Sequence, residues 1–459
     1  MFVKLAVLAC DMLRREPDPD MALNNWEQFA GALPDPADHY RLLFSQPKRL
    51  ELALAIFSRS QFLANTLIAR PELLQWVTAP EQVHRPVRRE ALEQELRGLA
   101  SAARDRAEWR RALRRLRRRE MLRIGTRDLC LRVDVRDIML DLSALAEAIL
   151  QVAAEQAWRD AGPGDTTATR ARFCVLAFGK LGGEELNYSS DIDLLAVYDD
   201  RRDASESPAE ETALFGSVMD RLRGDLAAHT EDGHAFRVDL RLRPYGSAGM
   251  LVSSVSGVEA YYREAAAPWE IQALLKLRPV AGSLPVGAAL IERLKPILLA
   301  RRDRATVAET ILQMRETAQR QQRRGVLGGL TDVKTGLGGI RDVEFLAQGL
   351  QLIHAAEHPE LLTPSTLQAL DELAEAGILP DNLAIELMND YIFLRRVEHY
   401  LQILEDRQIH ALPSDPSELE ALSKRMLGVQ ARADEFIAQL ESCQQRVRAA
   451  FDSHFIESR

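Results

Sequence analysis

The sequence predicts an α+β fold, in which one small mixed sheet lies between two helical regions of the chain. Three observations predict it. Apolar residues recur at the helical spacing of three and four residues up to about position 160. The same spacing returns from about position 285. Between these regions, short apolar runs have the length of strands. We therefore expect an N-terminal helical region at 1–160, a mixed-sheet domain at 161–284 and a C-terminal helical bundle at 285–459.

Length and composition agree with this organisation and exclude several classes of protein. The chain has 459 residues, enough for three domains of about 150 residues each. Its formal net charge of −9 argues against a protein that coats nucleic acid. The four cysteines are scattered without metal-ligand spacing, which excludes a zinc ribbon and favours a reducing compartment.

No segment predicts a membrane protein or an exported one. No apolar run approaches the roughly 18 residues that a membrane-spanning helix needs. Residues 1–10 are apolar, but the run is short and lacks a convincing cleavage site, so we expect the start of a helix or strand there. We expect a cytoplasmic protein.

The N-terminal region combines amphipathic helices with one arginine-dense stretch. Helical spacing is clear at residues 50–57 and 140–149. Between them, residues 104–123 hold ten arginines, and Trp109 and Leu113 mark one helical face. Such a helix can bind nucleic acid, or it can dock on an acidic partner or domain. We favour docking, since the chain as a whole is acidic.

The central segment begins where turn-forming residues gather, at 161–167. The apolar runs 172–178 and 191–198 are expected strands, and residues 211–228 are an expected helix. Residues 236–243 alternate strictly between apolar and polar side chains, which is the clearest strand signal in the chain.

The C-terminal region reads as a bundle of helices. Apolar stripes predict helices at 340–355, 366–376, 383–404 and 433–451, with loops near 336–339 and 413–416. His399 and His410 have no metal-ligand spacing to each other, so we expect surface or packing roles for both.

The densest group of chemically useful residues lies in the central segment. Glycines directly follow its first strand, and glycines let a backbone approach a phosphate closely. Asp191 and Asp193 stand two residues apart on the next strand, so both carboxylates face one side and can grip a hard cation. Asp239 shares the polar face of the third strand with Arg241 and Arg243, which suits a further metal position and the neutralisation of phosphate charge. This order indicates Mg²⁺-dependent phosphoryl or nucleotidyl transfer without a P-loop.

Several longer strings are specific enough to indicate a family, and they cover most of the chain. They are RLRRREMLRI at 115–124, FGKLGGEELNYSSDIDL at 178–194, RVDLRLRPYG at 237–246, Trp269-Glu270 with Lys276 downstream, KTGLGGIRDVEF at 334–345, FLRRVEHYLQ at 393–402 and HALP at 410–413. Together they resemble the glutamine synthetase adenylyltransferase/adenylyl-removing enzyme family. That family has two tandem units, and this chain has the length of one.

The resemblance implies a nucleotidyltransferase fold for the central domain and roles for individual residues. Asp191, Asp193 and Asp239 match the family's catalytic, metal-binding acids, and we expect Mg²⁺ as the cofactor. The implied nucleotide- and phosphate-binding residues are Gly182, Gly183, Ser190, Lys180, Arg241, Arg243 and Lys276.

The few lysines of the chain support some of these assignments. Only seven of the 59 basic residues are lysine, and codon bias explains that skew. It does not explain why Lys180, Lys276 and Lys334 all fall inside the matching strings. A compact ammonium and a planar guanidinium are not interchangeable around phosphates, so these lysines are candidates for the phosphate side of the site.

The resemblance also implies a reaction and its partners. One unit of the family attaches AMP to a tyrosine of glutamine synthetase, and the other removes it by phosphorolysis. Strings at 330–334 and 393–413 resemble the removing unit, whereas 246–254 resembles the adding unit. We expect removal of AMP with release of ADP, and adenylylation with ATP is the alternative.

A second alternative is a regulatory helical scaffold or a nucleic-acid-binding protein whose catalytic site is vestigial. Intact aspartates at all three positions count against it. The expected partners are glutamine synthetase, ATP or ADP, phosphate and a PII-type signalling protein, with no membrane and no nucleic acid.

Overall fold

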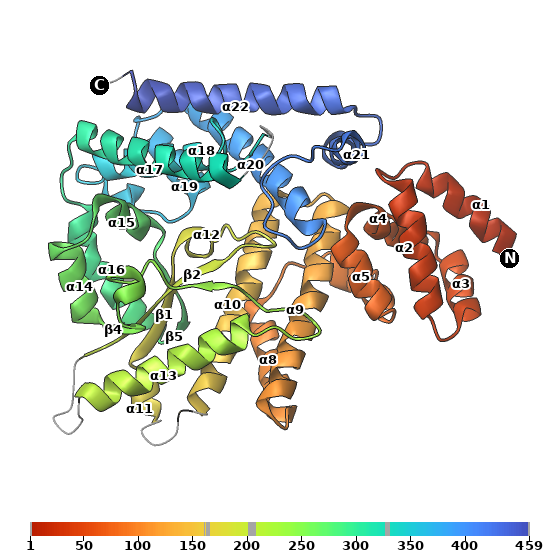
Figure 1. Cartoon of the computed structure of the whole chain (residues 1–459), viewed down its shortest axis with the longest axis horizontal. Coiled ribbons are helices and arrows are strands. Elements are labelled where there is room, and N and C mark those ends of the chain that lie inside the picture. The colour runs from red at the N-terminus through yellow and green to blue at the C-terminus, as the bar shows by residue number, and fades with distance from the viewer. Residues whose placement is uncertain (1, 160, 162–165, 201–207, 326–330, 458–459) are drawn as a thin grey trace.

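A computed structural model describes residues 2–159, 161, 166–200, 208–325 and 331–457. Helices dominate both ends of the chain, and one sheet lies near the centre of the molecule (Figure 1). The α+β prediction is therefore confirmed. The predicted boundary at 161–167 falls partly outside the described residues, and the three domain limits stay a prediction.

The N-terminal region is helical, as expected, and its first ten residues lie in a helix. Several helices begin at a side chain that accepts a hydrogen bond from the first turn, among them Asp18, Asp35, Ser60 and Asp105. The helices are α1 (Phe2–Leu13), α2 (Pro19–Ala32), α3 (Pro36–Ser45), α4 (Pro47–Arg59), α5 (Gln61–Ala69), α6 (Leu73–Val77), α7 (Pro80–Val83), α8 (Arg89–Ala102), α9 (Arg106–Leu129) and α10 (Val135–Arg159).

The sheet is mixed. Its strands are β1 (Phe173–Ala177), β2 (Ile192–Tyr198), β3 (Val238–Asp239), β4 (Val252–Ser254) and β5 (Arg278–Gly282). β1 runs antiparallel to β2 and β5, whereas β3 and β4 both run parallel to β2. β3 and β4 pair along the same edge of β2, so the chain leaves that edge after β3 and returns to it at β4. The first two predicted strands are confirmed, and β4 and β5 were not predicted.

The third predicted strand, 236–243, is mostly wrong. Only Val238 and Asp239 are in a strand. Directly after them, the Asp239 carboxylate accepts a hydrogen bond from the backbone N–H of Arg241 at 2.8 Å, which turns the chain away from β2. Phe236 and Leu240 are still buried, so the alternation reports burial on one side rather than continued pairing.

Short helices complete the central segment. The glycine-rich stretch after β1 is not an open loop but a four-residue helix, α12 (Gly179–Gly182). The helix expected at 211–228 is α13 (Pro208–Ala227). The remaining elements are α11 (Thr167–Arg170), η1 (Gly246–Ala248), α14 (Val255–Glu264), α15 (Pro268–Ala273) and η2 (Leu274–Lys276).

The C-terminal region is the predicted helical bundle. α22 packs along α18 and α20 and crosses the top of the molecule in Figure 1. All four predicted helices are present, with ends that differ by a few residues. The elements are α16 (Leu284–Leu298), α17 (Arg304–Gly325), α18 (Ile340–His354), η3 (Pro359–Leu361), α19 (Thr366–Glu375), α20 (Asp381–Ile403), α21 (Pro416–Leu427) and α22 (Ala433–Phe455).

One continuous apolar core joins the helices to the sheet. The Trp158 ring at the end of α10 meets Phe173 of β1 edge-on, with ring centroids 5.7 Å apart. Gln151 of α10 accepts a hydrogen bond from the backbone N–H of Gly282 at 2.9 Å. The sheet is therefore held by α10 from the N-terminal region. No helix among the described residues is both long and apolar enough to cross a membrane.

Candidate functional site

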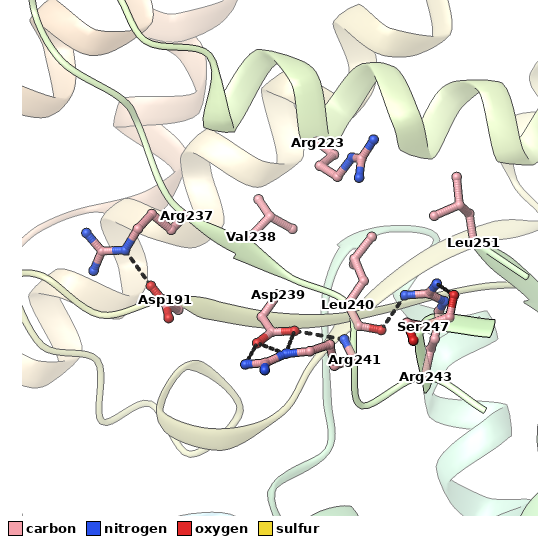
Figure 2. Close-up of a pocket in the computed structure, with 10 residues that line it drawn as sticks. All are labelled: Asp191, Arg223, Arg237, Val238, Asp239, Leu240, Arg241, Arg243, Ser247 and Leu251. Carbon is pink, nitrogen blue, oxygen red and sulfur yellow. Dashed lines mark hydrogen bonds and ion pairs between the residues drawn. The ribbon is translucent and has the colours of Figure 1, made fainter. Parts of the chain in front are cut away.

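The three predicted aspartates lie together at the edge of β2. Asp193 on β2 and Asp239 on β3 are register partners on parallel strands, so their side chains are neighbours. Asp191 lies directly before β2, and its negative charge is near enough to raise the pKa of Asp193. Asp191 and Asp239 line a pocket of about 460 Å³, together with Arg223, Arg237, Val238, Leu240, Arg241, Arg243, Ser247 and Leu251 (Figure 2).

The surroundings of the Asp193 carboxyl group disfavour its charged form. Burial and, after it, the negative charges of Asp239 and Asp191 together raise its pKa to about 6, against the opposing charges of Lys334 and Arg241. The backbone of Gly179 approaches this carboxylate closely, since a Cβ at that glycine would lie 3.0 Å from Asp193 Oδ2. Gly179 has a φ of +57°, which also favours glycine. The glycine motif contains this contact, but sequence reasoning did not assign it.

The other two carboxylates are paired with arginines. Figure 2 shows Arg237 turned toward Asp191 and Arg241 turned toward Asp239. The Arg237 guanidinium donates to Asp191 at 2.5 Å, and that of Arg241 donates to both oxygens of Asp239 at 3.1 and 2.8 Å. Burial raises the pKa of Asp239, but the hydrogen bonds from Arg241 outweigh it and lower the pKa below its ordinary value.

The donor set fits a hard divalent cation in its chemistry. Carboxylate oxygens are the ligands that Mg²⁺ prefers, and a cation beside Asp193 would offset the repulsion from its two acidic neighbours. In the arrangement that the structure gives to the described residues, no three Asp, Glu, His or Cys side chains converge on one point. The metal assignment of Asp191, Asp193 and Asp239 stays a prediction.

The glycines and the serine of the predicted phosphate site have different surroundings. A Cβ at Gly182 would lie 1.7 Å from the carbonyl oxygen of Lys276, and one at Gly183 would lie 2.8 Å from that of Pro364. Close packing of backbone against backbone therefore explains both glycines. Ser190 is half-buried directly before Asp191. Phosphate binding by these three residues stays a prediction.

Two of the predicted phosphate-binding cations are engaged within the protein. Arg243 donates to the carbonyl oxygens of Leu240, Ser247 and Gly249 at 2.8, 3.0 and 3.1 Å, and so holds the excursion between β3 and β4. The buried ammonium of Lys276 donates to Glu185 at 2.6 Å and to Thr366 at 2.9 Å. These contacts give Arg243 and Lys276 a structural role, and their binding to a nucleotide stays a prediction.

Lys180 is held by the C-terminal helices. Its ammonium donates to both carboxylate oxygens of Glu398 on α20, at 2.8 and 2.9 Å. Glu398 is completely buried, and His410 Nδ1 lies 3.1 Å from the same carboxylate. Burial lowers the pKa of Lys180 to about 7, although Glu398 raises it. Sequence reasoning placed Lys180 in the site but missed Glu398, for which the string at 393–402 was the available signal.

The segment between α12 and β2, residues 183–191, is fixed from two sides. Arg395 of α20 donates to the carbonyl oxygen of Glu185 and to the side chain of Asn187. The Tyr188 hydroxyl donates to Asp128 of α9 at 2.8 Å, and the buried His399 ring lies 3.1 Å from the same carboxylate. The packing role expected for His399 agrees with this. These contacts position the start of β2 and therefore Asp191.

The arginine-dense stretch forms most of α9 and docks inside the molecule. Arg106 and Arg110 donate to the Asp225 carboxylate near the end of α13 at 2.7 and 2.8 Å. Arg114 is fully buried and donates to the carbonyl oxygen of Asp225 at that end and to that of Gly233 in the following segment. The structure favours the docking interpretation over nucleic-acid binding, with the partner being α13 of the same chain.

Comparison with known proteins gives matches along most of the chain. A family described as glutamate-ammonia ligase adenylyltransferase matches residues 50–293. A second family, described as GlnD PII-uridylyltransferase, matches residues 307–455. The first match contains all five strands and the three aspartates, and the second contains most of the C-terminal bundle.

Three curated relatives carry the name bifunctional glutamine synthetase adenylyltransferase/adenylyl-removing enzyme. The relative from Thioalkalivibrio sulfidiphilus is 37% identical over 378 residues, which cover 80% of this chain and 39% of the relative. The one from Hahella chejuensis is 36% identical over 381 residues, 81% of this chain and 39% of the relative. The one from Pseudomonas aeruginosa is 36% identical over 376 residues, 80% and 38%. The chain thus spans about two fifths of the length of these relatives.

Proposed function

The chain belongs to the glutamate-ammonia ligase adenylyltransferase family, and from this premise we propose that it removes AMP from an adenylyl-tyrosine of glutamine synthetase by phosphorolysis. The observation that carries the proposal is the pairing of Asp193 with Asp239 on adjacent parallel strands, with Asp191 beside them. Such a group of carboxylates, two of which line a pocket together with arginines, suits phosphoryl chemistry. The proposed partners are glutamine synthetase, phosphate, ADP or ATP and a PII-type protein.

The proposed reaction is one displacement at phosphorus. An oxygen of inorganic phosphate attacks the phosphorus of the AMP group and forms the new P–O bond of ADP. The bond from phosphorus to the tyrosyl oxygen breaks, and that oxygen keeps the electron pair and takes a proton. The products are ADP and free tyrosine.

The chain's own residues hold the acids in place for this step. Asp191, Asp193 and Asp239 would hold Mg²⁺, whose chemistry is to stabilise charge on the transferred phosphoryl group and on the leaving oxygen. Arg237 and Arg241 orient two of the carboxylates, and the Gly179 backbone restricts the third. The arginines around the pocket also bring positive charge to a substrate whose phosphates are anionic.

The decisive experiment follows an AMP label on glutamine synthetase. We expect the chain with Mg²⁺ to release the label as ADP from the adenylylated enzyme, and only when phosphate is present. Asp193→Asn should abolish release, whereas Asp371→Asn, which changes an exposed carboxylate on α19, should not. Incorporation of label from ATP into the unmodified enzyme, without release, would favour adenylylation. If the chain neither releases nor incorporates the label, the proposed enzymatic role is contradicted.

A further inference from the structure

A second cavity, which we call the α13 groove, adjoins the pocket that Asp191 and Asp239 line. Its volume is about 760 Å³. One wall is formed by Ala209, Thr212, Ala213 and Gly216 of α13, and the other by residues 249–252, which lead into β4. Leu251 lines both the groove and the aspartate pocket, so the two meet at this side chain. In Figure 2, Leu251 lies at the end of the pocket away from Asp191.

Both walls of the groove continue into the aspartate pocket. On α13, Ala209 and Gly216 line the groove and Arg223 lines the pocket, at intervals of seven residues, which are two turns along one face of the helix. Opposite this face, Ser247 lines the pocket and Met250 lines the groove. From Gly216 to Arg223 the helix rises by about 10 Å, the length of about three residues of an extended chain.

The groove differs from the pocket in its chemistry. Two carboxylates and four arginines line the pocket, whereas no charged side chain is among the described residues that line the groove. The Thr212 hydroxyl lies 3.2 Å from the hydroxyl of Tyr198, so it is engaged within the protein. Met250 is 63% exposed, and a Cβ at Gly216 would meet no heavy atom within 4 Å. The groove therefore offers apolar surface and open space rather than charge.

We propose that the α13 groove binds the polypeptide on which the adenylyl-tyrosine stands, namely an extended segment of glutamine synthetase with apolar side chains next to the modified residue. This inference rests on the proposed function. A tyrosine that enters the pocket is part of a protein, so its neighbours in that chain must leave the pocket across the surface. The groove continues both walls of the pocket, and its apolar lining suits side chains rather than phosphates.

The wall opposite α13 is held in place before any substrate binds. Arg243 donates to the carbonyl oxygens of Ser247 and Gly249 at 3.0 and 3.1 Å. A Cβ at Gly249 would lie 1.9 Å from the carbonyl oxygen of Pro244, so the turn is also closely packed. A preformed wall loses little freedom when a peptide binds. Contacts in the groove can then orient the tyrosyl oxygen in the pocket, and free nucleotides cannot make them.

The test compares Gly216→Leu with Gly98→Leu. Both glycines lie inside helices, α13 and α8, and both have open space where a Cβ would stand. Neither substitution should lower the free energy of unfolding, since leucine favours a helix more than glycine does. The leucine at 216 fills the groove, whereas the leucine at 98 stands on the exposed side of α8.

The measurement is the release of labelled AMP, as ADP, from adenylylated glutamine synthetase. We expect Gly216→Leu to raise the KM for this protein about tenfold or more, the affinity that burial of one apolar side chain supplies. The KM for phosphate should not change, because phosphate occupies the pocket alone. Gly98→Leu should match the unchanged chain in both constants.

A second variant tests the opposite wall without altering α13. Met250→Ser removes an exposed apolar side chain from the groove, and Ile385→Ser makes a similar change on α20, where Ile385 is 56% exposed. Met250→Ser should also raise the KM for adenylylated glutamine synthetase, and Ile385→Ser should not. If Gly216→Leu unfolds at a lower temperature than the unchanged chain, the Met250→Ser result decides.

Binding of ADP identifies the occupant. Calorimetry with Mg²⁺ should give the same ADP affinity for Gly216→Leu and the unchanged chain. A loss of ADP affinity as large as the rise in KM would assign the groove to the nucleotide and overturn the inference. A change in the sedimentation of the chain alone would assign it to a second copy, with the same consequence. Unaltered KM values for adenylylated glutamine synthetase in both groove variants would also overturn it, whereas no release of label by the unchanged chain would contradict the proposed function instead.

Discussion

At the scale of single residues, neighbouring carboxylates of the site differ in how their charge is balanced. Asp239 receives several hydrogen bonds from Arg241, and its pKa falls. Asp193 is more enclosed, lies between two other aspartates, and has a pKa raised to about 6. The difference follows from position, because Asp193 points toward the Gly179 backbone rather than toward a guanidinium. A buried carboxylate repelled by two others lowers the stability of the metal-free fold, and a bound cation would relieve that repulsion.

Asp193→Asn should therefore stabilise the metal-free chain at neutral pH. The carboxyl titrates at about 6 in the folded chain and near its ordinary value of 3.8 when unfolded, so the folded state binds more protons between those values. The free energy of unfolding must then fall as pH rises from about 4 to about 6, by on the order of 3 kcal/mol. In Asp193→Asn, this fall of the free energy of unfolding with rising pH should be absent. Urea unfolding in EDTA from pH 4 to 8 measures it.

The matched control is Asp239→Asn, which removes a carboxyl whose pKa is lowered. At pH values above the ordinary pKa of aspartate, Asp239→Asn should lower the free energy of unfolding, whereas Asp193→Asn should raise it. If Asp193→Asn is less stable than the unchanged chain at pH 8, the electrostatic account of this acid is wrong. Both variants should weaken Mg²⁺ binding, which calorimetry checks independently.

At the scale of elements, α20 organises the site from outside the sheet. It carries Arg395, which holds residues 185–187, and Glu398, which holds Lys180 of α12. Both side chains are fully buried. A buried ion pair of this kind fixes the positions of its two side chains more than it stabilises the fold, because the loss of hydration offsets most of the attraction. α20 thus sets where α12 lies, and α12 sets the backbone that touches Asp193.

Glu398→Gln should be strongly destabilising, because it removes the carboxylate that pairs with the buried Lys180 ammonium beside Arg395. We expect a loss of about 3–5 kcal/mol in the free energy of unfolding, measured by urea denaturation. Adding Lys180→Met should recover much of the loss, because the unpaired charge is then gone. Glu292→Gln, at an exposed pair with Lys295, should cost less than about 1 kcal/mol. A double variant no more stable than Glu398→Gln would contradict this coupling.

At the scale of the whole molecule, the helical regions are parts of the site's framework rather than appendages. α10 packs on β5 and α13, and α9 holds the C-terminal end of α13 through its arginines. The last carbonyl groups of a helix have no partner within it, and no basic residue stands in the last turn of α13. Arg114 supplies the donors from another helix, with Nη2 at 2.8 Å from the Asp225 carbonyl oxygen.

Arg114→Ala should therefore lower the free energy of unfolding more than the substitution of an exposed arginine does. It leaves several buried carbonyl groups without donors, and we expect a loss of at least about 3 kcal/mol. Arg115→Ala is the control on the same helix, since that half-exposed side chain pairs with Asp232 at 3.1 Å and should cost less than about 1 kcal/mol. Thermal unfolding compares the two, and equal shifts would contradict the docking role.

Local patterns in the sequence predicted local structure well. β1, β2 and α13 follow from apolar spacing that each segment carries by itself. The strand expected at 236–243 was mostly wrong because alternation continues through a turn in which Leu240 stays buried. The glycines after β1 form a short helix that no apolar spacing indicated, and Gly182 packs there against the backbone of Lys276.

The sequence by itself determined the α+β class, the closely spaced Asp191 and Asp193 at the start of β2 and the family resemblance, because periodicity and motifs are properties of adjacent residues. Only the tertiary structure decided that Asp193 stands beside Asp239 and that Lys180 is bound by Glu398, 218 positions away. It also decided that Arg243 and Lys276 are engaged within the protein. Strand register and charge pairing depend on which distant segments share a core, and no local pattern encodes that choice.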